Sequence, residues 1–314
     1  MDAMIAAFDA ILPVILLIGL GSLLKISRRI PVEFFSAAEL FSYYIAFPAL
    51  LLSSTLGLPL SLDALFDLGG VIIATILCLS ALVVPVALWS FRDLTAFTSI
   101  LQGAIRPNTY LGLALAAALL DRQGFESIVL CVAISLPIVN LISVIALSLC
   151  STKGRASPGH MIRSIATNPI ILACIAGLSL NLLGFHHLPV ALDNVIAMLM
   201  KTAMPLGLIV VGGGLVSGER RPQPLSIGIA TILKMAVLPL TTWLIGTAMG
   251  LEPKLLASAV FFSALPTAPN AYILAKVMGG DAALMSSIIL FQTTLSFISL
   301  PLAAAFLPGL LSPP

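Results

Sequence analysis

Arg106-Pro107-Asn108-Thr109-Tyr110-Leu111-Gly112 and Ala264-Leu265-Pro266-Thr267-Ala268-Pro269-Asn270-Ala271-Tyr272 each place a proline–asparagine pair near the middle of an apolar segment. Proline lacks an amide hydrogen and clashes with the preceding helical turn. Both segments are therefore expected to break, the first at Pro107 and the second at Pro266 and Pro269. Because proline is favoured at the first position of a helix, the second half of each segment is predicted to begin at Pro107 and at Pro269.

Proline pairs recur in matching order and with matching neighbours in the two halves of the chain. The pairs are Pro13 and Pro169, Pro48 and Pro205, Pro85 and Pro239, Pro107 and Pro269, and Pro137 and Pro301. This pattern predicts a duplicated unit, with a first repeat at 1–150, a linker at 151–160 and a second repeat at 161–314. Each repeat holds five apolar segments, an odd number, so the second is expected to lie inverted in a membrane, as in many secondary transporters.

The composition indicates an integral membrane protein. Of the 314 residues, 60% are hydrophobic and only 9% are charged, whereas soluble domains carry roughly 25% charged residues. A membrane helix needs about 20 apolar residues. The segments that satisfy this length run from 4–24, 34–56, 65–89, 95–120, 125–149, 161–183, 189–217, 225–249, 255–278 and 283–307. We therefore predict an all-α protein with ten transmembrane helices, of which the fourth and ninth are broken and crossed.

The distribution of lysine and arginine predicts the orientation of the chain. With the N-terminus outside, the inner loops hold ten basic residues: Lys25, Arg28, Arg29, Arg92, Lys153, Arg155, Arg163, Arg220, Arg221 and Lys276. The outer loops hold only Arg122 and Lys254. Cytoplasmic loops carry the excess of positive charge, so both termini are expected on the outer, periplasmic side of a bacterial inner membrane.

The two breaks are suited to an anion. In inverted repeats, the half-helices that follow the breaks would approach the membrane centre from opposite sides and point their positive N-terminal ends at one region. Asn108 and Asn270 add amide donors there, and Arg106 adds a full positive charge. Two interpretations of Arg106 are open: it contacts the substrate, or Glu39 neutralises its charge. An arginine at a helix centre costs about 2.5–3.5 kcal/mol and usually has a functional role.

Further candidates surround the breaks. Tyr110 and Tyr272 follow the two asparagines, and Gln292 and Thr293 belong to a polar cluster in the last segment. Lys201 lies four residues before a proline in the seventh segment; it is a second candidate cation, with snorkelling or an ion pair with Asp193 as the alternative. The same segment carries a run of three glycines at 212–214, which is typical of close helix packing.

Two kinds of chemistry are absent from the broken segments. They contain no Asp or Glu, so coupling to a proton or sodium ion would need neutral oxygens, an acid at the rim or the substrate itself. All three histidines fall in loops, which argues against an intramembrane enzyme. No cofactor or metal site is expected. Lys234 lies about nine residues from the inner end of its segment and is interpreted as snorkelling partway toward it.

Four motifs together resemble the auxin efflux carrier family, in its prokaryotic branch with a short central loop. They are the stretches at 106–112, 167–172 with Gly177, 208–215 and 264–275. The resemblance implies a scaffold of segments 1, 2, 6 and 7, and a transport unit of segments 3–5 and 8–10 that moves against it. It also implies export or exchange of organic anions, with auxin in plants and malonate- or malate-type dicarboxylates in bacteria as expected substrates.

The sequence thus predicts a secondary transporter of a small mono- or dicarboxylate that works by alternating access. A sodium-coupled symporter of the bile acid:sodium symporter type and an anion channel are the alternatives. The expected partners are the anion and membrane lipid. A coupling proton or sodium ion and a second copy of the chain stay open as partners, and nucleic acid is not expected.

Overall fold

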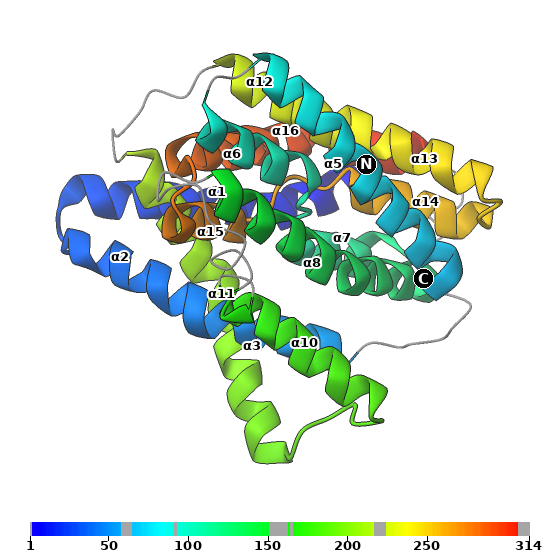
Figure 1. Cartoon of the computed structure of the whole chain (residues 1–314), viewed down its shortest axis with the longest axis horizontal. Helices are drawn as coiled ribbons and strands as arrows, with labels where there is room; N and C mark the ends of the chain where they lie inside the picture. Colours follow the sequence, from blue (N-terminus) through cyan, green and yellow to red (C-terminus); the bar gives the residue numbers. More distant parts are fainter. Residues whose placement is uncertain are drawn as a thin grey trace.

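The structure is a computed structural model that describes residues 2–57, 65–90, 93–150, 163, 166–216 and 224–306. Its elements are helices throughout (Figure 1). The first half holds α1 (Asp2–Ser27), α2 (Val32–Phe41), η1 (Ser42–Ala46), α3 (Phe47–Leu56), η2 (Leu65–Gly69), α5 (Gly70–Ser90), α6 (Leu94–Ile105), α7 (Thr109–Leu119) and α8 (Arg122–Cys150). The second half holds α10 (Pro169–Leu182), α11 (Val190–Leu215), α12 (Pro224–Ile232), η3 (Leu233–Val237), α13 (Leu238–Ala248), α14 (Pro253–Ser263), α15 (Asn270–Met278) and α16 (Ala282–Phe306).

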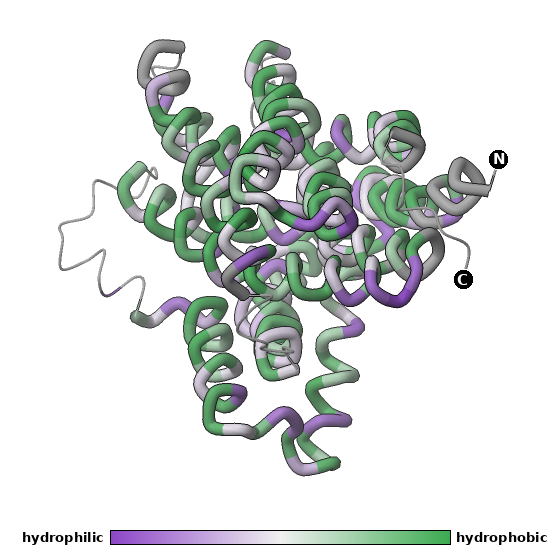
Figure 2. Tube along the Cα trace, turned by 90° about the vertical axis from the view of Figure 1, so that its right-hand side faces the viewer, coloured by the Kyte–Doolittle hydropathy of each residue, from purple (hydrophilic) through white to green (hydrophobic). Residues whose placement is uncertain are grey.

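The all-α membrane fold is confirmed. Six of the described helical segments are long and apolar enough to cross a membrane, and four shorter helices are apolar as well. Large apolar side chains such as Leu16, Leu182 and Val190 lie exposed on the outside of the bundle. Figure 2 shows hydrophobic residues on the outer helices as well as in the interior, which is the pattern expected where lipid replaces water. The count of ten spans stays a prediction, and the predicted linker lies outside the described residues.

Close packing of small residues joins α1 to α11. A Cβ atom added to Gly21 of α1 would collide with the carbonyl oxygen of Ile209 in α11, and one added to Gly212 would collide with the carbonyl oxygen of Ile18. The Ser22 hydroxyl also donates a hydrogen bond to the Gly212 carbonyl at 2.8 Å. The glycine run therefore packs helix against helix, as predicted. The helix pair α3 and α10 makes another extensive contact.

Wide π-helical turns accompany two of the prolines. The turn η1 ends two residues before Pro48 in the span from α2 to α3, and η3 ends two residues before Pro239 in the span from α12 to α13. A proline removes one backbone hydrogen bond and crowds the preceding turn, which a wider turn relieves. Pro13 and Pro137, in contrast, lie inside the continuous helices α1 and α8.

Candidate functional site

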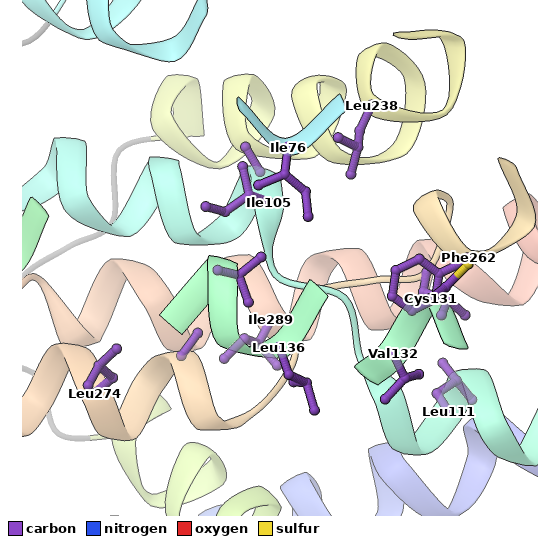
Figure 3. Close-up of a cluster of buried hydrophobic side chains, with 14 of the residues drawn as sticks. Ile76, Ile105, Leu111, Cys131, Val132, Leu136, Leu238, Phe262, Leu274 and Ile289 are labelled. Carbon is purple, nitrogen blue, oxygen red and sulfur yellow. The ribbon is translucent and has the colours of Figure 1, made fainter. Parts of the chain in front are cut away.

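Both predicted helix breaks are present. Residues 106–108 are extended and separate α6 from α7, and residues 264–269 separate α14 from α15. We refer to these two stretches together as the crossover. Buried apolar side chains surround it, among them Ile105 and Leu111 on either side of the first break and Phe262 before the second (Figure 3).

The two breaks contact each other through their backbones. Pro107 forms an antiparallel bridge with Thr267, and the Asn108 N–H donates to the Pro266 carbonyl oxygen at 2.7 Å. Each break thus satisfies part of the backbone that the other leaves without a helical partner, as buried irregular backbone requires. The crossed arrangement of the two broken segments is confirmed, and they run in opposite directions where they meet.

The predicted start of α7 at Pro107 is wrong by two residues. α7 begins at Thr109, and Asn108 is its N-cap, with the side-chain Oδ1 accepting a hydrogen bond from the Leu111 N–H at 3.2 Å. Asparagine is among the best N-cap residues, so Pro107 is left in the extended stretch. The predicted start of α15 at Pro269 is wrong by one residue, because Pro269 is the N-cap of α15 and Asn270 is its first residue.

Gln292 of α16 holds the crossover together. Its Oε1 accepts from the Thr267 N–H at 3.0 Å, and its Nε2 donates to the carbonyl oxygens of Gly103 at 3.1 Å and Ala230 at 3.3 Å. The Thr267 hydroxyl lies 2.7 Å from the same Oε1. The amide is therefore occupied by the protein, and Gln292, predicted as a substrate ligand, positions the two breaks.

Arg106 is almost completely buried, with 1% of its surface exposed. Its guanidinium donates to Gln102 Oε1 at 3.1 Å and to Asn140 Oδ1. Both partners are neutral amides, and within the described part of the chain Arg106 forms no ion pair, so the predicted alternative of neutralisation by Glu39 is not what the structure shows. A guanidinium has five N–H donors, and two hydrogen bonds leave several of them for a ligand.

Buried polar atoms without partners cluster around this arginine and the breaks. Three are amide nitrogens, which are donors: Gln102 Nε2, Asn108 Nδ2 and Asn140 Nδ2. Asn270 Oδ1 and the Thr293 hydroxyl are also unpaired. Leaving such a group unsatisfied costs about 1–3 kcal/mol, so these atoms are available to form hydrogen bonds with a ligand. An excess of donors around a buried cation is suited to an anion.

The remaining predicted residues are not all brought to the crossover. Tyr272 is buried, and its hydroxyl lies 3.3 Å from Glu39 Oε1 of α2. Lys201 has an exposed side chain on α11, and Asp193, its predicted ion-pair partner, lies instead 3.8 Å from His187. Tyr110 lies in the first turn of α7, and its side chain is outside the described part of the structure.

Two features of the site were not foreseen. Gln102 and Asn140 are not predicted from the sequence as the partners of Arg106, although Gln102 lies one helical turn before it, the spacing at which helical side chains meet. Lys234 does not snorkel. It is fully buried, with its Nζ donating to the Ser263 carbonyl oxygen at 3.1 Å.

Comparison with known proteins agrees with this architecture. The chain matches the model of a family described as membrane transport protein over residues 6–304. Over 135 residues it is 30% identical to a protein of Rhizobium meliloti (strain 1021) named "Putative malonate transporter". That stretch is 43% of this chain and 42% of the relative, so the match spans about two fifths of the curated relative. Because the family match extends over nearly the whole chain, the protein belongs to the membrane transport protein family, the family of the auxin efflux carriers.

Proposed function

We propose that the protein is a secondary transporter that binds one small carboxylate at the crossover and exposes it to the two membrane faces in turn. The observation that carries the proposal is the burial of Arg106 with two neutral amides as its partners. An unpaired charge in a membrane interior is costly. An anionic substrate would supply the missing negative charge, and the surrounding unpaired amide nitrogens would donate to its oxygens.

In this proposal each residue of the crossover has a distinct task. Arg106 forms bidentate hydrogen bonds with the carboxylate of the substrate, and the Asn108 amide donates a hydrogen bond to the substrate from the start of α7. Asn270 stands at the start of α15 and brings the positive end of that helix close to the anion. Thr293 of α16 is a further candidate contact, and a contact by Tyr110 of α7 stays a prediction from the sequence. Lys201 is assigned no contact, because its side chain is exposed on α11.

The substrate class that we favour is a short dicarboxylate. The name of the Rhizobium relative supports this choice, since malonate is a three-carbon dicarboxylate. The central loop of about ten residues also fits a prokaryotic transporter of metabolites. The scaffold would consist of α1, α2, α3, α10 and α11, and the helices carrying the crossover would move against it. We further place the protein in a bacterial inner membrane with both termini outside, and a second copy of the chain as a partner is compatible with this reading.

The test is exchange of labelled malonate in proteoliposomes loaded with unlabelled malonate. We expect saturable exchange that is stimulated by substrate on the opposite side, whereas a channel would give flux without such stimulation. Arg106→Ala should reduce exchange at least about a hundredfold. Arg106→Lys should recover only part of it, since an ammonium cannot replace the planar fork.

Arg122→Ala is the matched control, because Arg122 is exposed at the start of α8 and pairs with Glu126 at 2.9 Å. We expect it to exchange malonate like the unchanged protein. Full exchange by a folded Arg106→Ala protein would remove Arg106 from the site and, with it, the main support for the proposal.

A further inference from the structure

Lys234 is a second buried cation at the crossover, and the proposed binding of the anion does not use it. It lies in the π-helical turn η3 and has none of its surface exposed. Its Nζ donates to the carbonyl oxygen of Ser263 at 3.1 Å. Within the described residues it takes part in no ion pair, so its charge is not neutralised by a carboxylate.

Ser263 is the last residue of α14, immediately before the second break. The last carbonyl groups of a helix have no partner within the helix and form its negative end. In transporters with broken helices, such ends commonly coordinate a coupling sodium ion. Here the lysine ammonium occupies that position on α14.

The other half-helix that ends at the crossover is satisfied differently. The carbonyl oxygen of Gly103, in the last turn of α6, accepts from the neutral amide of Gln292 at 3.1 Å. The first residue after α6 is itself a cation, Arg106. Each half-helix that ends at the crossover thus has a positive side chain of the protein beside it, Arg106 at α6 and Lys234 at α14.

A small cavity adjoins the ammonium. It has a volume of about 10 Å³, enough for about one water molecule, and is lined by Lys234, Pro107, Thr75 and Ser263 with five apolar residues. Four of the apolar residues, Ile76, Ile105, Leu238 and Phe262, are labelled in Figure 3. The Thr75 hydroxyl is buried without a partner. Thr75 and Ser263 thus line this cavity together with Lys234, and they carry two oxygens of the kind that bind sodium, a hydroxyl and a helix-terminal carbonyl.

Side chains alternate in direction along an extended stretch, so Pro107 faces this cavity while Arg106 and Asn108 face away from it. The cation at Lys234 and the anion site at Arg106 lie on opposite sides of the same break. A positive charge on the cavity side would stabilise the bound anion electrostatically across the break, without direct contact.

We propose that the ammonium of Lys234 is a built-in cation that occupies the position of a coupling alkali ion, so that substrate exchange needs no sodium at the crossover. This inference rests on the proposed anion transport. It predicts that a shorter, neutral residue at this position opens a site for Na⁺ or Li⁺ between Ser263 and Thr75. Choline is too large for such a site and serves as the inert replacement ion.

The experiment compares the unchanged protein with Lys234→Arg, Lys234→Met and Lys234→Ala in the malonate exchange assay, in sodium, lithium or choline chloride. We expect the unchanged protein and Lys234→Arg to exchange equally in all three salts. Lys234→Met should lose about tenfold or more in every salt, because it fills the space without a charge. Lys234→Ala should be equally impaired in choline and recover at least severalfold in sodium or lithium.

A second measurement does not depend on malonate. At constant ionic strength, sodium or lithium should raise the midpoint of thermal unfolding of Lys234→Ala relative to choline, because a ligand that binds only the folded state stabilises it. The unchanged protein and Lys234→Met should show no such difference. Lys254→Met is the matched control, since it removes the same charge at the opposite end of α14 and should retain exchange.

Three results would overturn the inference. They are a sodium requirement in the unchanged protein, full exchange by Lys234→Met, and the absence of an alkali-specific thermal shift in folded Lys234→Ala. If Lys234→Ala does not fold, equal exchange by Lys234→Arg and Lys234→Met overturns it, and a large difference between them supports it. A cation-specific shift in Lys234→Ala without carboxylate exchange by the unchanged protein would support the cation site and reject the proposed function.

Discussion

A single residue, Asn108, combines a structural and a functional task in one amide group. Its Oδ1 caps α7 by accepting from the Leu111 N–H at 3.2 Å, while its Nδ2 is buried without a partner. The two tasks can be separated by substitution, because aspartate caps a helix as well as asparagine does. Aspartate has no donor, however, and its negative charge would repel an anionic substrate.

We therefore expect Asn108→Asp to keep the N-cap of α7 and to lose malonate affinity by at least about tenfold, with a lower midpoint of thermal unfolding because a carboxylate is costly to bury at this position. Thermal-shift titration of the purified protein with malonate measures the loss. Asn168→Asp is the control, since Asn168 also caps a helix, α10, with Oδ1 accepting from the Ile170 N–H at 3.0 Å, while its Nδ2 already donates to the Tyr43 hydroxyl at 3.0 Å. It should retain malonate affinity. Unchanged malonate affinity in Asn108→Asp would place the anion elsewhere.

For single residues, the sequence predicts which side chains belong to the site better than it predicts their hydrogen-bond partners. Arg106 and Asn108 stand out in the sequence because a cation and an amide beside a proline are unusual in an apolar segment. The partners Gln102 and Asn140 come from two different helices, and no local pattern pairs them. The predicted snorkelling of Lys234 is wrong for a related reason: its distance from the end of the segment favours snorkelling, whereas the end of α14 supplies a carbonyl oxygen for its ammonium.

Among the elements, the helix pair α1 and α11 depends on the absence of side chains at two glycines. A methyl group on Gly21 would overlap the backbone of Ile209, which cannot move aside as a flexible side chain can. We expect Gly21→Ala to destabilise the protein by roughly 2 kcal/mol, within the range for overpacked sites. Gly19→Ala, on the same helix, meets nothing within 4 Å and should leave the unfolding midpoint in detergent unchanged. Equal midpoints of the two variants would contradict the tight contact.

The starts of α8 and α14 are joined by an ion pair between Asp121 and Lys254. The hydrogen bond from Lys254 lowers the pKa of Asp121 below its ordinary value of 3.8. Because the folded-state pKa is lowered, the ion pair stabilises the protein above about pH 4, and this stabilisation is lost as the pH falls through the folded-state value. Asp121 Oδ1 also accepts a hydrogen bond from the Gly124 N–H at 2.9 Å. An asparagine at position 121 can keep this cap while it removes the charge.

We thus expect Asp121→Asn to unfold at a lower temperature than the unchanged protein between pH 5 and pH 8. The gap between the two midpoints should be constant over that interval and shrink below about pH 4. Thermal unfolding in detergent across this pH series measures it. A gap that persists undiminished at pH 3 would show that Asp121 acts through something other than its charge.

The elements themselves were largely predictable. Where the structure describes them, the predicted apolar segments correspond to helices or to pairs of half-helices, because a membrane requires backbone hydrogen bonds to be satisfied within the protein. Which prolines break a helix was harder to predict. Pro137 stays within α8, whereas Pro107 meets a second broken segment that supplies backbone partners. A break therefore depends on a contact across the molecule, which a single segment does not encode.

In the whole molecule, the two halves carry similar helix caps at corresponding positions. Asp121 caps the start of α8 through the Gly124 N–H, and Asp281 caps the start of α16 through the Leu284 N–H, both at 2.9 Å. The Ser99 hydroxyl of α6 donates to the Asp281 carbonyl oxygen at 2.8 Å. These matched contacts support the proposed duplication. The Ser99 contact ties α6 to α16, and the ion pair between Lys254 and Asp121 ties α14 to α8, which would let the broken segments move with these helices as one unit.

If that unit moves against the scaffold, a covalent link between them should stop transport. Gly207 of α11 and Pro269 of the crossover are suitable, because a Cβ atom built on Gly207 lies 3.6 Å from the Pro269 Cβ, a separation typical of disulfides. We expect a Gly207→Cys, Pro269→Cys protein, with its four native cysteines replaced, to lose malonate exchange on oxidation and to regain it on reduction. The reduced form and the two single-cysteine proteins, oxidised in parallel, are the controls. Undiminished exchange by the fully oxidised double variant would mean that the substrate crosses without relative motion of α11 and the crossover, and alternating access by such a movement would have to be abandoned.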